Sequence, residues 1–209
     1  GIAENTIIIL FSDNGGTLDP NYTEQAYWGN GTKEEILEIP LTSNHPKRAG
    51  KGTIYDGATA VPCIVRWPGE VRGGTVSEAF FSGADFFPTF LEMAEARIPY
   101  GLTLDGISQV PALLEMGEPR QVLYGFWPNY IEQTGSIPAA WIREGDYKLI
   151  RFFADGPGQT DRHELYDVAN DPGETNDLAA RMPEVVDELS ERLDRHLEGT
   201  GAGIPVPNP

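Results

Sequence analysis

The stretch Thr6–Gly16, T-I-I-I-L-F-S-D-N-G-G, decides how the rest of the sequence is read. Residues 7–11 form an apolar run that is too short for a stable helix. Its β-branched side chains favour a strand buried on both faces, as in a parallel α/β sheet. Such sheets carry their chemistry at the carboxyl ends of the strands. Asp13 and Asn14 stand at that end, and each offers an oxygen of the kind that Ca²⁺ or Mg²⁺ prefers.

The same residues also fit a plain turn. Asn-Gly and Asp-Asn-Gly are strong turn signals, and Gly15 and Gly16 allow a positive φ. On this stretch alone a turn is the commoner outcome. A metal site therefore needs support from elsewhere in the chain.

Composition limits the class of protein. The 209 residues suffice for one large or two small domains with a core, and no run approaches the ~20 apolar residues of a membrane span. A formal net charge of -17 argues against nucleic acid and against an anionic membrane as partners, although local cations can still attract a small anion. The single cysteine, Cys63, excludes an internal disulfide and leaves the compartment open. Because a buried strand follows directly on G-I-A-E-N, we expect an upstream part.

A second polar segment, residues 44–57, reads N-H-P-K-R-A-G-K-G-T-I-Y-D-G. Glycines flank Lys51, and a lysine in such a loop can meet phosphate or sulfate as a point charge. The segment fails the P-loop template, which requires Gly at 45 and Ser or Thr at 52. By default Lys51 is a solvated turn lysine and His45 an ordinary loop histidine. The basic residues that gather here in an otherwise acidic chain are His45, Lys47, Arg48 and Lys51.

The other elements predict an α/β part followed by an antiparallel sheet. Residues 61–67 read as a second buried strand with Cys63 in the core, and residues 82–97 as a helix that begins near Asp85 and buries an aromatic stripe. A long irregular loop is expected at 17–44. After a boundary at 98–101 the pattern predicts short strands, a hairpin turn at Gly145 and a final helix. These strands are expected at 121–127, 139–143, 147–153 and 163–167, and the helix from Pro183 to Gly199.

Six segments, in sequence order, resemble landmarks of the formylglycine-dependent sulfatases, which are arylsulfatase-like members of the alkaline phosphatase superfamily. They are S-D-N-G-G at 12–16, R-A-G-K-G-T-I-Y-D-G-A-T-A-V-P-C-I-V-R-W-P-G at 48–69, D-F-F-P-T-F-L-E-M-A at 85–94, L-D-G-I-S-Q-V-P-A-L-L at 104–114, R-E-G-D-Y-K-L-I at 143–150 and E-L-Y-D-V-A-N-D-P-G-E-T-N-D-L-A at 164–179. The resemblance extends to about residue 197 and implies the C-terminal half of such an enzyme.

The fold that this resemblance implies is α/β. Residues 1–118 would be the closing part of an alkaline-phosphatase-like α/β sandwich. Residues 119–198 would form a small C-terminal α+β subdomain with an antiparallel sheet and a packing helix, and residues 199–209 a tail. Ala49 stands where the family often has Gly, and Ala60 where Arg often precedes Val-Pro.

The resemblance also implies a site. Asp13 and Asn14 would be ligands of Ca²⁺, with Mg²⁺ as the alternative. Lys51 would contact the sulfate of a small aryl or sugar sulfate and act in catalysis, and His45 would be a second substrate-binding residue. The formylglycine nucleophile and the remaining ligands would lie in a missing N-terminal part, so the chain alone is expected to be inactive. Cys63 lacks the Cys-x-Pro-x-Arg context and cannot be the modified cysteine.

The activity expected from this resemblance is calcium-assisted hydrolysis of a sulfate ester. Two alternatives remain open at this point. One is a phosphonate or phosphodiester hydrolase of the same superfamily, and the other is a non-catalytic anion-binding relative.

Overall fold

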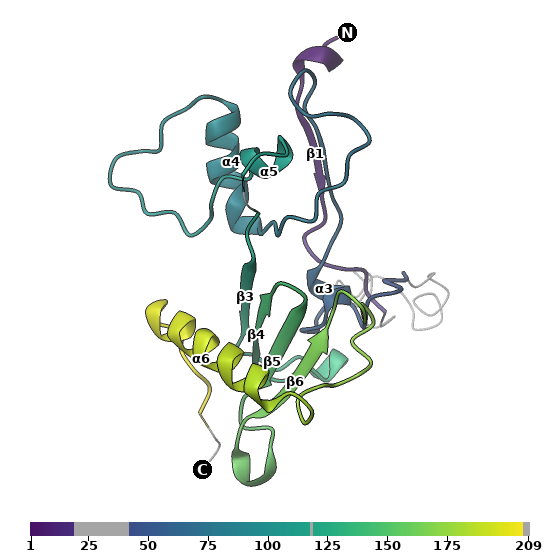
Figure 1. Ribbon diagram of the computed structural model, residues 1–209, viewed down its shortest axis with the longest axis vertical. Helices are drawn as coiled ribbons and strands as arrows, with labels where there is room; N and C mark the ends of the chain where they lie inside the picture. Colours follow the sequence, from purple (N-terminus) through teal and green to yellow (C-terminus); the bar gives the residue numbers. More distant parts are fainter. Residues whose placement is uncertain (19–41, 118, 207–209) are drawn as a thin grey trace, which may run out of the picture. The chain divides into compact units, whose positions relative to one another are not determined.

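Figure 1 shows a computed structural model of the chain, which describes residues 1–18, 42–117 and 119–206. Most of the loop expected at 17–44 therefore lies outside the described residues. The chain forms two compact units, one from residues 1–10 and 63–123 and the other from residues 11–62 and 124–209. Within the described ranges, no helix combines the length and the apolar character needed to cross a membrane. The domain ranges 1–118, 119–198 and 199–209 stay a prediction about the family architecture.

The first unit is built on a two-stranded sheet. Strand β1 (Ile8–Phe11) pairs with β2 (Cys63–Arg66). The Arg66 side chain donates to the Ala3 carbonyl over 2.6 Å, and near the other end the Ser12 amide donates to the Pro62 carbonyl over 3.4 Å. These contacts show that the two strands run in opposite directions. The helices of this unit are η1 (Ala3–Asn5), η3 (Gly83–Asp85), α4 (Phe86–Met93) and α5 (Val110–Leu113).

The expectation that β1 and β2 are buried on both faces is wrong for the described structure. Ile8 is 52% exposed, Leu10 57% and Ile64 62%. Cys63, expected in the core, is also exposed. The apolar runs did mark strands. However, a two-stranded sheet buries its faces only where other elements cover them, and burial by other elements cannot be read from the run itself.

A buried carboxylate fixes the start of α4. Asp85 is fully buried and accepts two hydrogen bonds from the Arg120 guanidinium, over 2.8 and 2.7 Å. It also accepts the Ser82 amide over 2.8 Å, in a reciprocal cap of the preceding turn. The predicted helix start near Asp85 is therefore confirmed. The aromatic stripe is only partly in a core, because Phe87 and Phe90 are 47% and 46% exposed.

The second unit contains a four-stranded sheet in the order β3–β4–β5–β6 (Figure 1). The β4–β5 and β5–β6 pairs are antiparallel. This confirms the predicted strands, hairpin and final helix to within a residue or two. Among the described residues of this unit, the strands are β3 (Val122–Trp127), β4 (Ala139–Glu144), β5 (Tyr147–Phe152) and β6 (Arg162–Asp167), and the helices are α3 (Asp56–Thr59), η4 (Glu132–Thr134), η5 (Pro157–Gln159) and α6 (Pro183–Gly199).

The strand register divides this sheet into two differently covered faces. Ile142 pairs with Leu149, and Leu149 with Leu165, so these three side chains share the face that α6 covers. All three are 0% exposed. The helix contributes a row of leucines one turn apart, as its predicted apolar stripe requires. The buried members of this row are Leu189, Leu193 and Leu197.

The opposite face of the same sheet packs against the segment that carries Lys51. Ile150, Phe152 and Tyr166 form a buried cluster there, and Ile54 and Tyr55 pack on it. The predicted basic segment is thus seated on a sheet face that is closed within this unit.

Candidate functional site

Two loops from distant parts of the sequence, residues 12–17 and 44–57, are joined by hydrogen bonds. The Asn44 side chain donates to the Gly16 carbonyl over 2.8 Å and accepts the Gly16 amide over 2.9 Å. The Lys51 amide donates to the same Gly16 carbonyl over 3.2 Å. The turn that carries Asp13 and the loop that carries Lys51 are therefore held together through the peptide backbone.

Glycines permit this close approach. A Cβ atom added to Gly15 would lie 1.7 Å from the Gly57 carbonyl oxygen, and one added to Gly50 would lie 2.2 Å from the Gly16 oxygen. A Cβ on Gly57 would lie 2.2 Å from the carbonyl oxygens of Arg48 and Ala49. The contacting atoms belong to the backbone, which cannot move aside as a flexible side chain can. We define Gly15, Gly50 and Gly57 as the glycine seam.

The two candidate metal ligands lie on the turn beside this seam. Asp13 is exposed and Asn14 half-buried. The Ser12 hydroxyl donates to the Asn14 carbonyl over 2.6 Å and so shapes the turn. A carboxylate and an amide oxygen suit Ca²⁺, but the usual shell has six to eight oxygens and these two side chains supply a minority. Among the residues that the structure describes, no group of three or more His, Cys, Asp and Glu side chains could hold a metal ion.

Lys51 occupies the corner of a tight turn. The Thr53 amide donates to the Gly50 carbonyl over 3.1 Å, and Gly52 has a φ of +87°, as the third position of a type II turn requires. Lys51 is the second residue of that turn and is exposed. His45 is exposed on the same loop. The structure thus places the predicted site residues Asp13, Asn14, His45 and Lys51 on two joined loops of one unit.

The other two basic residues of this loop point into the protein. The Lys47 ammonium donates to the Ala60 carbonyl over 2.7 Å, and burial lowers its pKa from the ordinary lysine value. The Arg48 guanidinium donates to the Tyr166 hydroxyl over 3.0 Å and lies 3.7 Å from the centre of the Tyr55 ring. Lys47 and Arg48 therefore hold the loop in place, whereas His45 and Lys51 face outward.

A buried ionic cluster anchors the far end of the loop. Lys148 is 0% exposed, and its ammonium donates to Asp56 Oδ1 over 2.7 Å, to Glu174 Oε1 over 2.8 Å and to the Ile54 carbonyl over 3.1 Å. The second oxygen of Glu174 accepts the Asp56 amide over 2.7 Å. Burial raises the pKa of the Glu174 carboxyl, while the neighbouring Lys148 ammonium opposes that rise. We call Lys148, Asp56 and Glu174 the buried ionic cluster.

The sequence analysis missed this cluster, although a signal was present. Lys148 alternates with Ile150 and Phe152 along β5, so it lies on a face that those residues mark as buried. A lysine at such a position requires carboxylate partners. Both partners stand in segments that carry the resemblance, but their meeting is a long-range contact that no local pattern reveals.

A second buried carboxylate supports the same sheet face. The hydroxyls of Tyr55 and Tyr166 donate to Glu164 Oε2 over 3.0 and 2.8 Å. Burial together with the Glu164 charge raises the pKa of both hydroxyls, so each remains a donor. Tyr55 thereby adds a hydrogen bond between the loop and the sheet.

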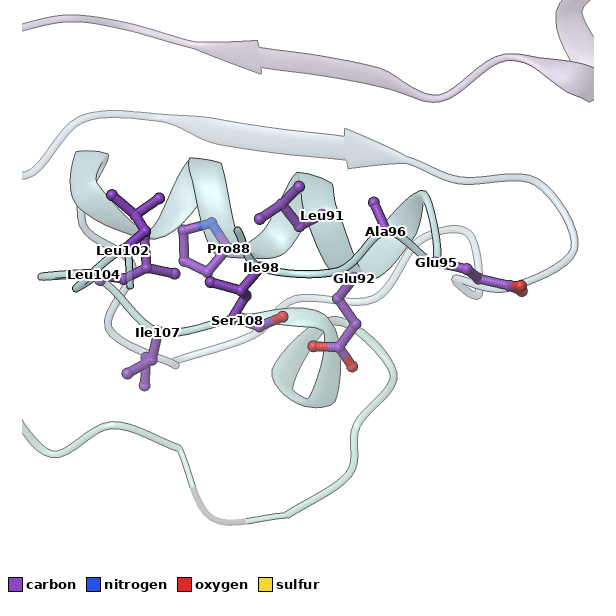
Figure 2. Close-up of a pocket in the computed structure, with 11 residues that line it drawn as sticks. Pro88, Leu91, Glu92, Glu95, Ala96, Ile98, Leu102, Leu104, Ile107 and Ser108 are labelled. Atoms are coloured by element: carbon purple, nitrogen blue, oxygen red, sulfur yellow. The ribbon is translucent and has the colours of Figure 1, made fainter. Parts of the chain in front are cut away.

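An open pocket of about 730 Å³ lies in the first unit (Figure 2). Its lining residues fall between Pro88 and Ser108 and are distant in sequence from the two joined loops. Apolar side chains such as Leu91 and Ile107 line it, and its charged lining residues are Glu92 and Glu95. Carboxylates repel a sulfate or phosphate ester, so this pocket does not suit an anionic substrate. The two joined loops are the candidate site.

Comparison with known proteins gives consistent matches. Residues 34–199 match the family described as N-sulphoglucosamine sulphohydrolase, C-terminal. Human arylsulfatase A is 32% identical in an alignment of length 213 that covers 91% of this chain and 38% of that protein. The N-acetylgalactosamine-6-O-sulfatase of Bacteroides thetaiotaomicron is 31% identical over 199 residues, which cover 92% of this chain and 36% of that protein.

A solved structure agrees. It is described as a complex with its substrate D-glucosamine-2-N,6-O-disulfate, and it superposes with a TM-score of 0.69 at 26% identity, over 97% of this chain and 36% of that one. The α/β fold class with an antiparallel C-terminal sheet is confirmed. The chain spans a little over a third of the length of these relatives.

Proposed function

This chain belongs to the sulfatase family, and from that premise we propose that it contributes part of the active site of a sulfuric ester hydrolase. The reaction is hydrolysis of a small sulfate ester. Names of relatives support both an aryl sulfate and a sugar sulfate as substrate classes. The chain's share of the site would be the two joined loops.

The observation that carries this proposal is the hydrogen-bonded join between the loops. Lys51 N and Asn44 Nδ2 both donate to the Gly16 carbonyl, so the Lys51 turn and the Asp13–Asn14 turn form one rigid feature. Under this proposal, the Lys51 cation and the metal-ligand oxygens of Asp13 and Asn14 would serve one site. This pairing suits an ester whose charge collects on non-bridging oxygens.

The proposed metal is Ca²⁺, with Mg²⁺ as the alternative. Asp13 and Asn14 would hold it through one carboxylate and one amide oxygen, and the remaining oxygens would come from outside this chain. The bound ion would stabilise negative charge on the sulfuryl oxygens. The side-chain oxygens of the Asp13–Asn14 turn suit this role in their accessibility, because Asp13 is exposed and Asn14 half-buried.

Lys51 would act on the substrate directly. Its ammonium would contact the sulfate and offset the charge that develops as the S–O bond breaks. His45, on the same exposed loop, would be a second substrate contact. A formylglycine nucleophile is expected from the part of the protein that precedes this chain in the family.

The test is steady-state kinetics on the natural protein that carries this sequence, with an aryl sulfate and the matching aryl phosphonate. We expect the sulfate to be preferred. Lys51→Ala should lower kcat/KM for the sulfate by about 10²–10³-fold, the usual effect of removing one preorganised stabiliser of transition-state charge. Lys51→Arg should recover only part, because a planar guanidinium does not reproduce the compact ammonium.

The control for Lys51 is Arg195→Ala, which removes an exposed cation on α6 that pairs with Glu191 over 3.7 Å. It should leave the kinetics unchanged. Preference for the phosphonate would establish the phosphonate hydrolase instead. Sulfate binding without turnover would establish the anion-binding relative. Equal losses from Lys51→Ala and Arg195→Ala would contradict the assigned role of Lys51.

Calcium affinity tests the second half of the proposal. Calorimetry should show weak Ca²⁺ binding to residues 1–209 and much tighter binding to the longer natural protein, because Asp13 and Asn14 supply a minority of the ligands. Residues 1–209 alone should show no turnover. Equal affinities for both proteins, or affinity that Asp13→Ala does not lower, would place the metal site elsewhere.

A further inference from the structure

A short segment of the second unit, residues 131–136, touches the peptide next to Lys51. The segment is folded back on itself by a bridge in which the Ile131 amide donates to the Ser136 carbonyl over 2.9 Å. Two of its hydroxyls converge on one acceptor. Thr134 Oγ1 lies 2.7 Å and Ser136 Oγ 2.5 Å from the carbonyl oxygen of Gly52.

The two hydroxyl groups have more acceptors within reach than protons to donate. The two hydroxyls also lie 3.0 Å from one another, which makes three short contacts for two protons. Ser136 donates to the Gly52 oxygen over the shortest of the three. Thr134 then donates to the same oxygen, which has two lone pairs, to Ser136 Oγ, or to the Ile131 carbonyl over 3.5 Å. With Ser136 as donor, the Gly52 carbonyl accepts at least one hydroxyl in each of these arrangements.

Residues 131–136 also pack closely against the turn at Gly52. A Cβ added to Gly52 would lie 2.9 Å from Thr134 Cγ2 and 3.6 Å from Ile131 Cδ1. Gly52 also has a φ of +87°, which L side chains rarely adopt. Position 52 thus requires glycine for its conformation and for its distance from Thr134.

The opposite side of the turn is fixed as well. The Lys51 amide donates to the Gly16 carbonyl over 3.2 Å, and the Thr53 hydroxyl donates to the Gly50 carbonyl over 2.9 Å. The backbone of the Lys51 turn is therefore hydrogen-bonded to Gly16 on one side and to the 131–136 segment on the other.

We propose that Thr134 and Ser136 are positioning residues for Lys51, acting through the Gly52 carbonyl. The proposal rests on the proposed role of Lys51 at the sulfate. The hydroxyl pair stops the turn from pivoting about its Gly16 contact, so that the ammonium emerges in one place. Because a small misplacement of a group that stabilises transition-state charge lowers the chemical rate, the effect falls on kcat more than on KM.

The experiment compares Thr134→Val, Ser136→Ala and their combination in the natural protein, each with and without Lys51→Ala. With Lys51 present, we expect the combined variant to lower kcat by about 10-fold or more with little change in KM. In the Lys51→Ala background the same pair should cause less than about a 2-fold further loss, because residues that act through one group are not additive. Thr134→Ser, which keeps a hydroxyl, should retain most activity.

A matched control separates positioning from stability. Thr160→Val removes another threonine hydroxyl of the same unit, one that donates to the Pro157 carbonyl over 3.0 Å, and should leave kcat unchanged. If the Thr134 and Ser136 variants lower kcat equally in both backgrounds, their role is general and the inference fails. If they do not lower kcat while Lys51→Ala does, the inference also fails, but the proposed function stands.

Two further outcomes are decisive. No effect of Lys51→Ala itself would overturn the proposed function and this inference with it. If the combined variant does not fold, the single variants carry the same comparison, since each removes one of the two hydroxyls from the Gly52 carbonyl.

Discussion

The two units differ in how completely they bury their apolar residues. In the second unit Ile142, Leu149 and Leu193 are 0% exposed, and even the charged Lys148 is fully enclosed. In the first unit Leu10 and Ile64 are 57% and 62% exposed, although both stand on strands. Both units come from sequences with clear apolar strands. The difference therefore lies in which faces the rest of each unit covers.

The comparison shows where the candidate site takes its rigidity. Its loops rest on the closed sheet face of the second unit, through the buried ionic cluster and the Tyr55–Glu164 hydrogen bond. A rigid support suits the role proposed for Lys51, because the position of a charged group determines how strongly it stabilises the transition state.

The largest effect is expected from breaking the buried ionic cluster. Lys148→Met keeps the side-chain length but leaves Asp56 and Glu174 without their cation. The free energy of unfolding should fall by about 3–5 kcal/mol, the usual result of leaving buried charge unpaired. Urea denaturation followed by tryptophan fluorescence measures it. Adding Glu174→Gln should restore part of the loss; no loss from Lys148→Met would mean that the loop is anchored by other contacts.

A matched pair of leucine substitutions tests the contrast in burial. Leu193→Ala empties a site that is 0% exposed and should cost about 2–5 kcal/mol of unfolding free energy. Leu10→Ala, at a site that is 57% exposed, should cost less than about 0.5 kcal/mol in the 209-residue chain. Denaturation of both variants gives the comparison. Similar costs would show that the β1 face is covered after all.

A smaller effect is expected at Lys47. Lys47→Met removes the hydrogen bond to the Ala60 carbonyl and should cost about 1–2 kcal/mol of stability, as for one bond made by a charged donor. Any kinetic effect should be small beside that of Lys51→Ala. Thermal unfolding and kcat/KM measured on the same samples separate the two. A loss of activity without loss of stability would assign Lys47 to the site.

The smallest effect has the opposite sign. Ala49 has a φ of 57°, a conformation that disfavours any residue with a Cβ. Ala49→Gly should raise the free energy of unfolding by up to about 1 kcal/mol, because relief of this strain exceeds the added flexibility of the unfolded chain. Ala154→Gly, at a φ of 53°, is the control and should change in the same direction. Destabilisation at Ala49 alone would mean that its methyl group makes a useful contact.

The sequence predicted the second unit better than the first for a physical reason. Alternation along β4–β6 and the leucine spacing of α6 are local patterns, and α6, which covers one face of the sheet, follows β6 directly as the next helix or strand. The strand pattern of β1 was also correct. Its burial was not, because burial depends on distant elements rather than on the strand.

The sequence predicts candidate residues for the site but not how they are arranged. Motif resemblance predicts the candidates Asp13, Asn14, His45 and Lys51. It also marks Ala49 as a departure from glycine, and Ala49 has a positive φ. The join through Asn44 and the contact of Thr134 with Gly52 connect residues 28 and 82 positions apart. Contacts at such separation leave no periodic trace in a single sequence.

The glycine seam has a consequence for how these loops can diversify. Gly15, Gly50 and Gly57 leave no room for a Cβ, so a library that randomises both loops should return glycine at these three positions whichever ester is selected. Their intolerance would appear in a screen for folded protein. If the proposed function holds, intolerance at the exposed residues Asp13 and Lys51 would appear in a screen for turnover. New substrate preferences in this scaffold therefore have to arise from positions outside the seam.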